Sequence, residues 1–245
     1  MRRGSLDLAL ALLCAASAAR ALDPFEIQVY DGTANPKGGV GLELHLNVAS
    51  SAGHFTLEPS YGLTDFWELG GYLQSALRSD GTFEYAGVKL RSKLVTVAGF
   101  DPRWRLGVNL ELSLLPQRYD PNSSGGEIRP IAAWESELFL FALNPIFGLS
   151  FGGTGLRNGP TFEPAAMVKV KLKELIALGV EYYGDLGALG AIEPLRGQQH
   201  YLFETIDVIA VKRLEINLGI GQGLTARSTN WVLKGIVGWT FEPRR

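Results

Sequence analysis

Cysteine is almost absent from this sequence of 245 residues, in which Cys14 is the only one. A single thiol cannot close an intramolecular disulfide, so the fold must be held by its core or by backbone hydrogen bonds. Histidine is also scarce, and His45, His54 and His200 lie in three separate segments. Scattered histidines without cysteine lack the spacing of a metal site. We therefore expect neither a metal nor a cofactor.

Long apolar runs and blocks of one charge are absent as well. No segment holds the ~18 uninterrupted apolar residues that a membrane-spanning helix needs, which argues against the inner membrane. Lysine and arginine number 23, against 25 aspartates and glutamates, for a formal net charge of −2. Without a basic block, the sequence gives no reason to expect a nucleic-acid partner.

The first 21 residues have the pattern of a secretory signal peptide. Arg2 and Arg3 precede an apolar stretch, residues 8–19, that is too short to cross a bilayer. Ala19 and Ala21 then place small residues where signal peptidase cuts. A buried N-terminal helix is the alternative. Export of the chain would leave the periplasm and the outer membrane as its locations.

The rest of the sequence alternates apolar and polar residues with a period of two, as half-exposed β-strands do. In "GVGLELHLNVA" (39–49) five aliphatic residues share one face, whereas Glu43 and His45 lie on the other. In a later segment we expect Ala86 and Val88 on the apolar face. Twelve segments reach about nine or more residues, the length a tilted strand needs to cross a bilayer. Residues 200–211 alternate too poorly for their faces to be assigned.

The number of strands and the lengths of their connections predict an all-β fold, a transmembrane antiparallel up-and-down β-barrel of about 12 strands. An even strand number is the rule for single-chain bacterial barrels. Links after even strands are mostly tight, whereas those after odd strands include residues 116–126, 152–160 and 185–199. Short turns on one side and long loops on the other indicate the outer membrane of a Gram-negative bacterium, with both termini periplasmic.

Three parts of the chain follow from this prediction. Residues 1–21 are the expected signal peptide, and residues 40–242 form the barrel. Residues 22–39 precede the first strand and have no place in the wall. They are either a partial plug in the periplasmic mouth or a loose tail.

The tryptophans support a lipid-facing apolar side. Four of them fall on the apolar face near the expected periplasmic ends of their strands, and one falls near the opposite rim; they are Trp67, Trp104, Trp134 and Trp239, and Trp231. Indole favours the membrane interface, so this pattern indicates an aromatic girdle. The alternative, a soluble sandwich with a tryptophan-rich core, explains neither the girdle nor the asymmetry of the loops.

The polar faces would then line the lumen, and they carry charges of both signs. The lumen-lining candidates are Glu43, His45, Glu58, Glu68, Lys89, Arg91, Lys93, Arg105, Glu111, Glu127, Arg129, Glu163, Lys169, Lys171, Glu181, Glu215 and Lys234. A charge at membrane depth is costly unless it meets water or a partner. The set is either the lining of a polar conduit or a salt-bridged filling that closes a narrow barrel, and the sequence leaves both open.

Catalytic chemistry has little support. Outer-membrane phospholipases also have twelve strands, but they need a serine activated by a histidine on the lipid-facing side. Ser50 and Ser51 lie near His54, yet no third residue stands at a spacing that would orient the histidine. We expect that the protein is not an enzyme.

Several phrases resemble the outer-membrane transporter family named after the meta-pathway of phenol degradation. They are "EIQVYDG" (26–32), "GLELHLN" (41–47), "TLEPSYGLTDFWELGGYLQ" (56–74), "YAGVKLRSK" (85–93), "GEIRPIAAWE" (126–135), "FEPAAMVKVK" (162–171) and "HYLFE" (200–204), together with the closing strand. The resemblance implies a barrel that takes up aromatic or other hydrophobic molecules. One departure is the end of the chain, where Phe241 is followed by Glu-Pro-Arg-Arg, although barrels usually end on an aromatic residue read by the assembly machinery.

The expected function is therefore a passive channel or transporter for small hydrophobic or aromatic solutes. The expected partners are outer-membrane lipid, the barrel assembly machinery and a small-molecule solute. The alternative is a structural or binding barrel whose charge-filled lumen is closed and transports nothing.

Overall fold

The computed structural model describes residues 22–49, 52–96, 101–120, 123–152 and 159–242. The expected signal peptide lies outside these residues. In the described part of the chain, no helix has the length and apolar character to cross a membrane.

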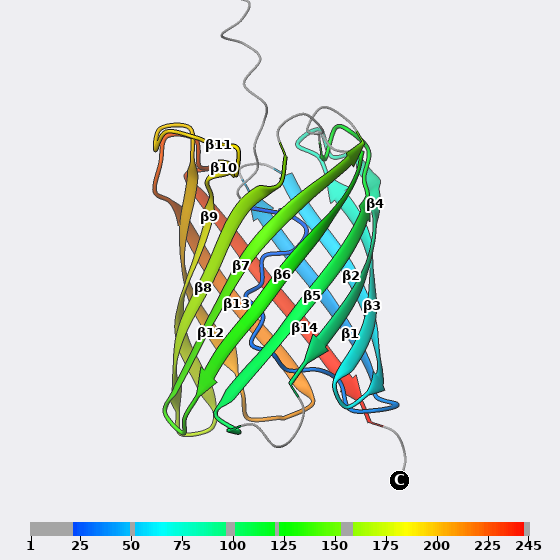
Figure 1. Cartoon of the computed structure of the whole chain (residues 1–245), viewed down its shortest axis with the longest axis vertical. Helices are drawn as coiled ribbons and strands as arrows, with labels where there is room; N and C mark the ends of the chain where they lie inside the picture. The colour runs from blue at the N-terminus through cyan, green and yellow to red at the C-terminus, as the bar shows by residue number, and fades with distance from the viewer. Residues whose placement is uncertain (1–21, 50–51, 97–100, 121–122, 153–158, 243–245) are drawn as a thin grey trace, which may run out of the picture.

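Twelve strands close into an antiparallel barrel (Figure 1), which confirms the predicted fold class. Each strand pairs with its neighbour along the chain, and β1 pairs with β14 to complete the ring. Closure gives every strand two partners, the condition for strands to cross hydrocarbon. The barrel strands are β1 (Val40–Ala49), β2 (Ala52–Thr64), β3 (Trp67–Leu77), β4 (Phe83–Val95), β5 (Trp104–Leu114), β6 (Ser124–Glu135), β7 (Phe139–Gly152), β8 (Thr161–Leu172), β9 (Ile176–Asp185), β12 (Gln199–Val208), β13 (Leu214–Gly223) and β14 (Trp231–Phe241).

Two short strands lie in the longest predicted loop. β10 (Gly187–Ala188) and β11 (Ala191–Ile192) pair with each other, and β10 also contacts the start of β8 through Ala188 and Thr161. The loop at 185–199 is therefore partly ordered as a hairpin. It stands at the same end of the barrel as the β3–β4 loop (Figure 1), opposite the short turns.

The outer wall of the barrel is apolar and the inner wall polar. On β1, Leu44 and Leu46 are 39% and 38% exposed, whereas His45 between them is fully buried. Burial alternates in the same way along other strands, such as β2 and β14. A soluble protein would bury the leucines, so this exterior is made to contact lipid.

A β-bulge changes the facing of one strand. The β3–β4 register shifts between Gln74 and Ser75, which pair with Gly87 and Tyr85. Ala86 is skipped and is fully buried in the interior, so the prediction that it shares the lipid-facing side of Val88 is wrong. Gly87 adopts φ +138°, a conformation that glycine tolerates readily.

The faces of β12, which the sequence left unassigned, are clear in the structure. Tyr201 and Phe203 point into the lumen, at 3% and 0% exposure, and Leu202 points outward at 40%. Glu204 shares the outward face with Leu202 and is exposed. A carboxylate therefore stands on the apolar outer wall.

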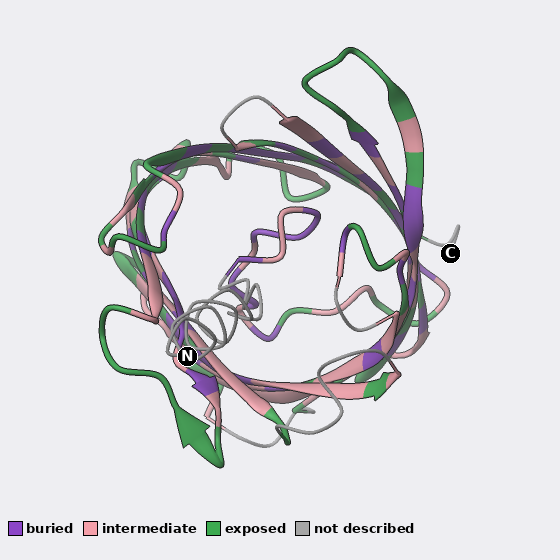
Figure 2. Cartoon of the chain, turned by 90° about the horizontal axis from the view of Figure 1, so that it is seen from above, coloured by how far each residue is buried: buried purple, intermediate pink, exposed green. Residues whose placement is uncertain are grey.

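Residues 22–37, here termed the strap, run through the lumen along the barrel axis (Figures 1 and 2). Phe25 packs edge-on against His54 and Tyr119, with ring centroids 5.0 and 5.5 Å apart. Ile27 is 1% exposed in an apolar cluster with Phe203. Near the short turns the backbone N–H of Lys37 donates to Asp65 at 2.9 Å. The strap thus spans the lumen from the long-loop side to the short-turn side.

The two ends of the described chain lie at opposite ends of the barrel. The strap begins toward the long loops, whereas β14 ends beside the short turns (Figure 1). Removal of the expected signal peptide would make the strap the start of the chain, and the strap begins at the long-loop end, so the expectation that both termini are periplasmic is not confirmed.

Candidate functional site

The candidate site is the lumen, where strap and wall are joined by ion pairs. Lys89 of β4 contacts Asp23 of the strap at 2.5 Å, Glu26 at 3.4 Å and Glu111 of β5 at 3.2 Å. Arg129 of β6 reaches the other oxygen of Glu26 at 3.3 Å. Glu26 is therefore enclosed by two cations. Buried charges are tolerated when paired in this way.

Tyr30 anchors the middle of the strap. Its hydroxyl lies 2.9 Å from Glu26 and 2.7 Å from the hydroxyl of Tyr72 on β3. Its backbone N–H donates to Asn144 Oδ1 at 2.7 Å, and Asn144 Nδ2 donates to its carbonyl at 3.0 Å. The Arg129 guanidinium stacks 4.5 Å from the centre of its ring. The Asn144 side chain of β7 thus makes the two hydrogen bonds to the Tyr30 backbone that a neighbouring strand would otherwise make.

A second network joins strap and wall toward the short turns. Arg91 joins Glu58 at 2.5 Å and Glu68 at 2.6 Å, and Lys93 contacts the same oxygen of Glu68 at 3.0 Å. The backbone N–H of Asn35 donates to the other oxygen of Glu68 at 2.6 Å. These contacts hold the part of the strap nearest the short turns against β2–β4.

The remaining predicted cations are also paired. Arg105 contacts Asp31 at 3.0 Å and also Glu135, which Lys171 approaches to 2.7 Å. On the opposite wall, Lys234 contacts Glu181 at 2.5 Å, and Lys169 lies 2.8 Å from Asp207 and 3.5 Å from Glu181.

All seventeen lumen-lining candidates are buried or half-buried on the inner side of the strands. The structure gathers most of them into these networks but sets two apart. Glu163 accepts a hydrogen bond from Thr161 at 2.5 Å and has no lysine or arginine within ion-pair distance in the described chain. Among the described residues, Glu215 accepts a hydrogen bond from the Gln28 side-chain amide at 3.3 Å and has no lysine or arginine within ion-pair distance.

Sequence reasoning missed the partners supplied by the strap and by β12. Asp23, Glu26 and Asp31 precede the first strand, where alternation carries no information. Asp207 lies in the segment whose faces could not be assigned. Asp207 itself alternates with the aliphatic residues Ile206 and Val208, but Glu204 on the outer face and the inward-facing Phe203 break the alternation of the segment as a whole.

The tryptophans stand on the outer wall. Trp67, Trp104, Trp231 and Trp239 are 39–44% exposed. Trp134 is half-buried beside Phe141, with ring centroids 5.8 Å apart, and pairs with Trp104 across the β5–β6 ladder.

At the long-loop end, Tyr119 links a loop to the strap. Its hydroxyl hydrogen-bonds Glu84, and burial together with this carboxylate raises the pKa of Tyr119. At the short-turn end, a hydrogen bond from the Arg103 side chain holds the pKa of the exposed Asp101 at about 2. Both groups keep their usual charge near neutral pH.

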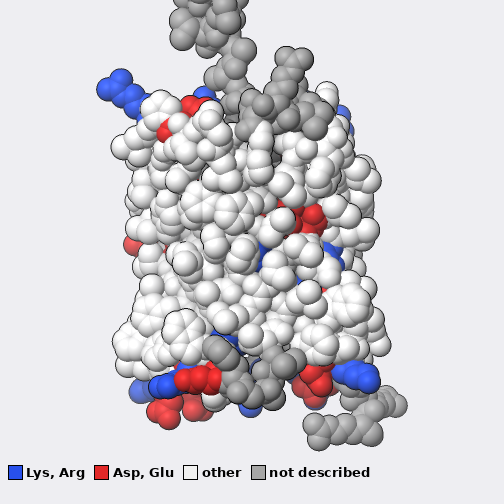
Figure 3. Space-filling model, viewed as in Figure 1, with Lys and Arg blue, Asp and Glu red and all other residues white. Residues whose placement is uncertain are grey.

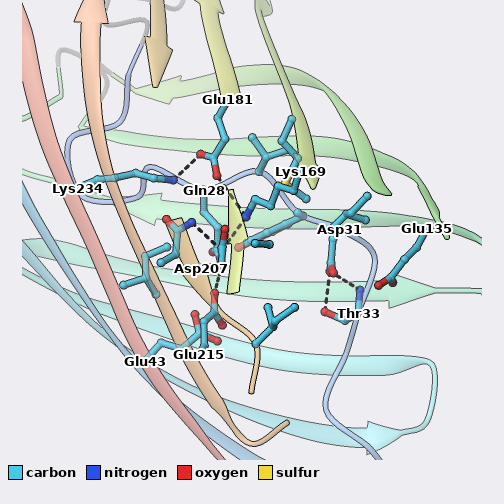
Figure 4. A pocket seen from close by; sticks show the side chains of 18 of the residues that line it. Gln28, Asp31, Thr33, Glu43, Glu135, Lys169, Glu181, Asp207, Glu215 and Lys234 are labelled. Atoms are coloured by element: carbon cyan, nitrogen blue, oxygen red, sulfur yellow. Dashed lines mark hydrogen bonds and ion pairs between the residues drawn. The ribbon is translucent and has the colours of Figure 1, made fainter. Parts of the chain in front are cut away.

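Between the strap and the lower wall lies a cavity of about 280 Å³ (Figure 4). It is lined by strap residues 28–31 and by both charged and apolar side chains. Acidic groups face it from β1, β12 and β13, namely Glu43, Asp207 and Glu215. Leu140 and Met167 line it from β7 and β8.

One set of metal-ligand types meets in the described chain, formed by Glu43, His45 and Glu58. His45 Nε2 lies 3.6 Å from Glu43 and 3.1 Å from Glu58. The Arg91 guanidinium already contacts Glu58 at 2.5 Å. A metal ion here would be repelled by this neighbouring cation, so the set is better described as part of the ion-pair network.

Neither a family model nor a curated protein matches this sequence. The resemblance to the phenol meta-pathway family is thus not confirmed. Solved structures do match. The NanC porin superposes with a TM-score of 0.57 at 10% identity, covering 83% of this chain and 100% of that one.

Two further structures have similar scores. The KdgM porin gives 0.55 at 9% identity, covering 83% of this chain and 99% of its own. The COG4313 outer membrane channel from Pseudomonas putida F1 gives 0.56 at 11% identity, covering 88% and 100%. At such low identity the likeness concerns the fold, and the chain has the fold of a porin-like outer-membrane β-barrel.

Proposed function

We propose that the protein is a passive channel of the outer membrane for small hydrophobic or aromatic solutes. The apolar exterior supports the location in lipid, and the tryptophan positions support a girdle at the membrane interface. The strap acts as a plug in this proposal. It occupies the axial route, so polar solutes meet a lumen filled by paired charges.

One observation carries the choice of a hydrophobic solute. The β6–β7 ladder is interrupted between the pair Ile128–Phe147 and the pair Ala132–Leu143. The register is the same on both sides, so the strands have not slipped. Pro130 and Pro145 face each other inside the gap, and proline has no N–H to donate.

The interruption lies where a solute could pass between lumen and lipid. Pro145 also pairs with Pro164 of β8, so prolines occupy three adjacent strands at one height on the lipid-facing side. Figure 3 shows acidic and basic atoms at mid-height on this otherwise apolar face. An interrupted ladder opens at lower cost than a continuous one, and a hydrophobic solute can then exit sideways into lipid.

A cysteine pair can lock this part of the wall. In the variant Ala132→Cys/Leu143→Cys, the pair that borders the gap and leaves both prolines in place, we expect oxidation to reduce uptake of labelled aromatics into proteoliposomes, and reduction with dithiothreitol to restore it. Leu44→Cys/Leu57→Cys, a pair on the intact β1–β2 ladder, is the matched control. Equal uptake by the oxidised and reduced forms of the first variant would contradict the lateral route.

The closed barrel is the second candidate, and the strap itself favours it. Glu26 is fully enclosed by Lys89, Arg129 and Tyr30, so an axial pore would require these contacts to break. Planar-bilayer conductance and aromatic uptake separate the two candidates. Uptake with low conductance supports the lateral channel, whereas the absence of both supports the closed barrel.

A further inference from the structure

The cavity wall over β12 and β13 holds acceptor atoms that lack donors. Asp207 Oδ1 accepts from Lys169 Nζ and from Asn217 Nδ2, both at 2.8 Å. Asp207 Oδ2 is buried and has no hydrogen-bond partner among the described residues. A buried acceptor without a donor costs about 1–3 kcal/mol. This oxygen is therefore suited to accept a hydrogen bond from a bound ligand.

Asn217 repeats the pattern with a side chain that is almost fully buried. It is 3% exposed and lines the cavity. Its contact with Asp207 fixes the amide nitrogen on that side, which leaves Oδ1 as the remaining polar atom. Oδ1 also finds no partner in the described part of the protein.

Two carboxylates complete the acceptor set. Glu43 and Glu215 pair with Gly238 from its two sides. A Cβ at Gly238 would lie 2.6 Å from Glu43 Cγ and 3.4 Å from Glu215 Cβ, so both side chains lean over the glycine. Figure 4 shows them side by side below Asp207. Neither has a lysine or arginine within ion-pair distance in the described chain, and Glu43 has only His45, at 3.6 Å.

The lining also has an apolar part. Leu140, Met167 and the strap residue Val29 contribute to it, and Ile236 lies across the β13–β14 ladder from Asn217. The cations that line the cavity each contact an acid; they are Arg91, Lys93, Lys169, Lys171 and Lys234. A volume of about 280 Å³ lies near the lower end of the range for small-molecule sites. Its occupant must therefore be small, with donors and positive charge at one end and an apolar body at the other.

We propose that this cavity binds a small primary organic ammonium with an apolar or aromatic body. An ammonium group has three N–H donors and no acceptor. Glu43, Glu215 and the free oxygens of Asp207 and Asn217 offer at least one acceptor for each of these three donors. An organic cation fits better than a bare metal ion, because the one metal-like set in the described chain is Glu43, His45 and Glu58, which includes neither Glu215 nor Asp207.

Binding to the purified barrel in detergent tests the site without any transport step. The probes are 2-phenylethylammonium, its neutral analogue 2-phenylethanol and the anion phenylacetate, measured by titration calorimetry. We expect saturable binding of the ammonium, about tenfold or more tighter than the alcohol, and none of phenylacetate. Equal affinity for ammonium and alcohol, or no binding of the ammonium, would overturn the proposal.

Variants locate the site. Glu215→Gln and, separately, Glu43→Gln should each weaken ammonium binding by about tenfold, the loss of one charged hydrogen bond. Glu163→Gln, a lumen carboxylate outside the cavity, should bind like the parent protein. Heat-modifiable gel migration reports folding of each variant. If a variant fails to fold, competition between the ammonium and CaCl₂ on the parent protein decides: displacement at equal concentrations would assign the site to an inorganic cation.

Because this site goes beyond the proposed function, the two can fail separately. A barrel that binds the ammonium but does not transport aromatics keeps the binding site and loses the channel. A barrel that transports neutral aromatics but does not bind the ammonium supports the channel and contradicts the binding site.

Discussion

At the scale of single residues, solvation decides which side of the wall a side chain occupies. Lys234 on β14 is 4% exposed and contacts Glu181, whereas its neighbour Leu233 is 43% exposed to the outside. The lysine is stable there because its charge is paired inside the barrel. Leucine is stable in contact with lipid, whereas a lysine on that face would have no ion-pair partner.

A lysine on the lipid side tests this directly. Leu110 is 41% exposed near the middle of β5. Leu110→Lys should lower the free energy of unfolding in lipid by about 2–4 kcal/mol. Leu110→Ala, which removes the leucine without adding charge, should cost much less. Urea titration in phospholipid vesicles measures both, and equal losses would show that the outer face does not meet hydrocarbon.

Glu204 is the exception on the lipid face. It pairs across β12 with Val180 and Ile220, both exposed and aliphatic. A glutamate in this position destabilises a barrel by less than the ~2–4 kcal/mol of lysine, and Glu204→Gln should recover part of that energy as a higher melting temperature. A lower melting temperature would instead show that the carboxylate has a stabilising partner in the membrane.

At the scale of elements, the strap contributes acidic groups that the wall needs. Deleting residues 22–37 removes Asp23, Glu26 and Asp31 and leaves Lys89 and Arg129 with fewer counter-ions. We expect larger single-channel conductance and a shift of selectivity toward anions. A glycine–serine segment of the same length is the control, since it restores bulk without charge. Unchanged conductance after deletion would contradict the plug.

The barrel strands were predictable because a wall between lipid and a charged lumen imposes a strict period of two. That period placed Glu58, Lys89 and Arg91 inside, where the structure has them buried. The interior partners of these residues were less accessible, because the strap has no alternation and its positions depend on contacts far away in sequence.

Local irregularities account for the other differences. Ala86 was assigned to the wrong face because the bulge at Gly87 shifts the β3–β4 register by one residue, and one residue reverses every facing beyond it. On β12, aromatic side chains point into the lumen and Glu204 points toward lipid. The positions of its polar residues therefore do not indicate which face is the inner one. The β10–β11 hairpin was hidden in a glycine-rich loop whose ladder is only two residue pairs long.

At the scale of the whole molecule, polarity runs in the opposite sense to that of a soluble protein. The interior holds ion pairs such as Arg91–Glu58, and the exterior holds leucines, valines and tryptophans. Each cation of the lumen has an acid within reach, so the wall can close around the strap without an uncompensated charge. Glu43, Glu163 and Glu215 depart from this balance, because no lysine or arginine of the described chain lies within ion-pair distance of them, and Glu43 and Glu215 face the cavity.

The sidedness of the barrel gives the last prediction. Ala191 lies in the exposed β10–β11 hairpin at the long-loop end, and Lys212 in the exposed turn between β12 and β13 at the other end. Long loops face outward in outer-membrane barrels. In intact cells, a membrane-impermeant maleimide should label Ala191→Cys and leave Lys212→Cys unlabelled until the outer membrane is permeabilised. Residues 22–245 contain no native cysteine, so the signal belongs to the introduced thiol. Labelling of Lys212→Cys alone in intact cells would show that the barrel has the opposite orientation in the membrane. The strap would then enter the lumen from the periplasmic side.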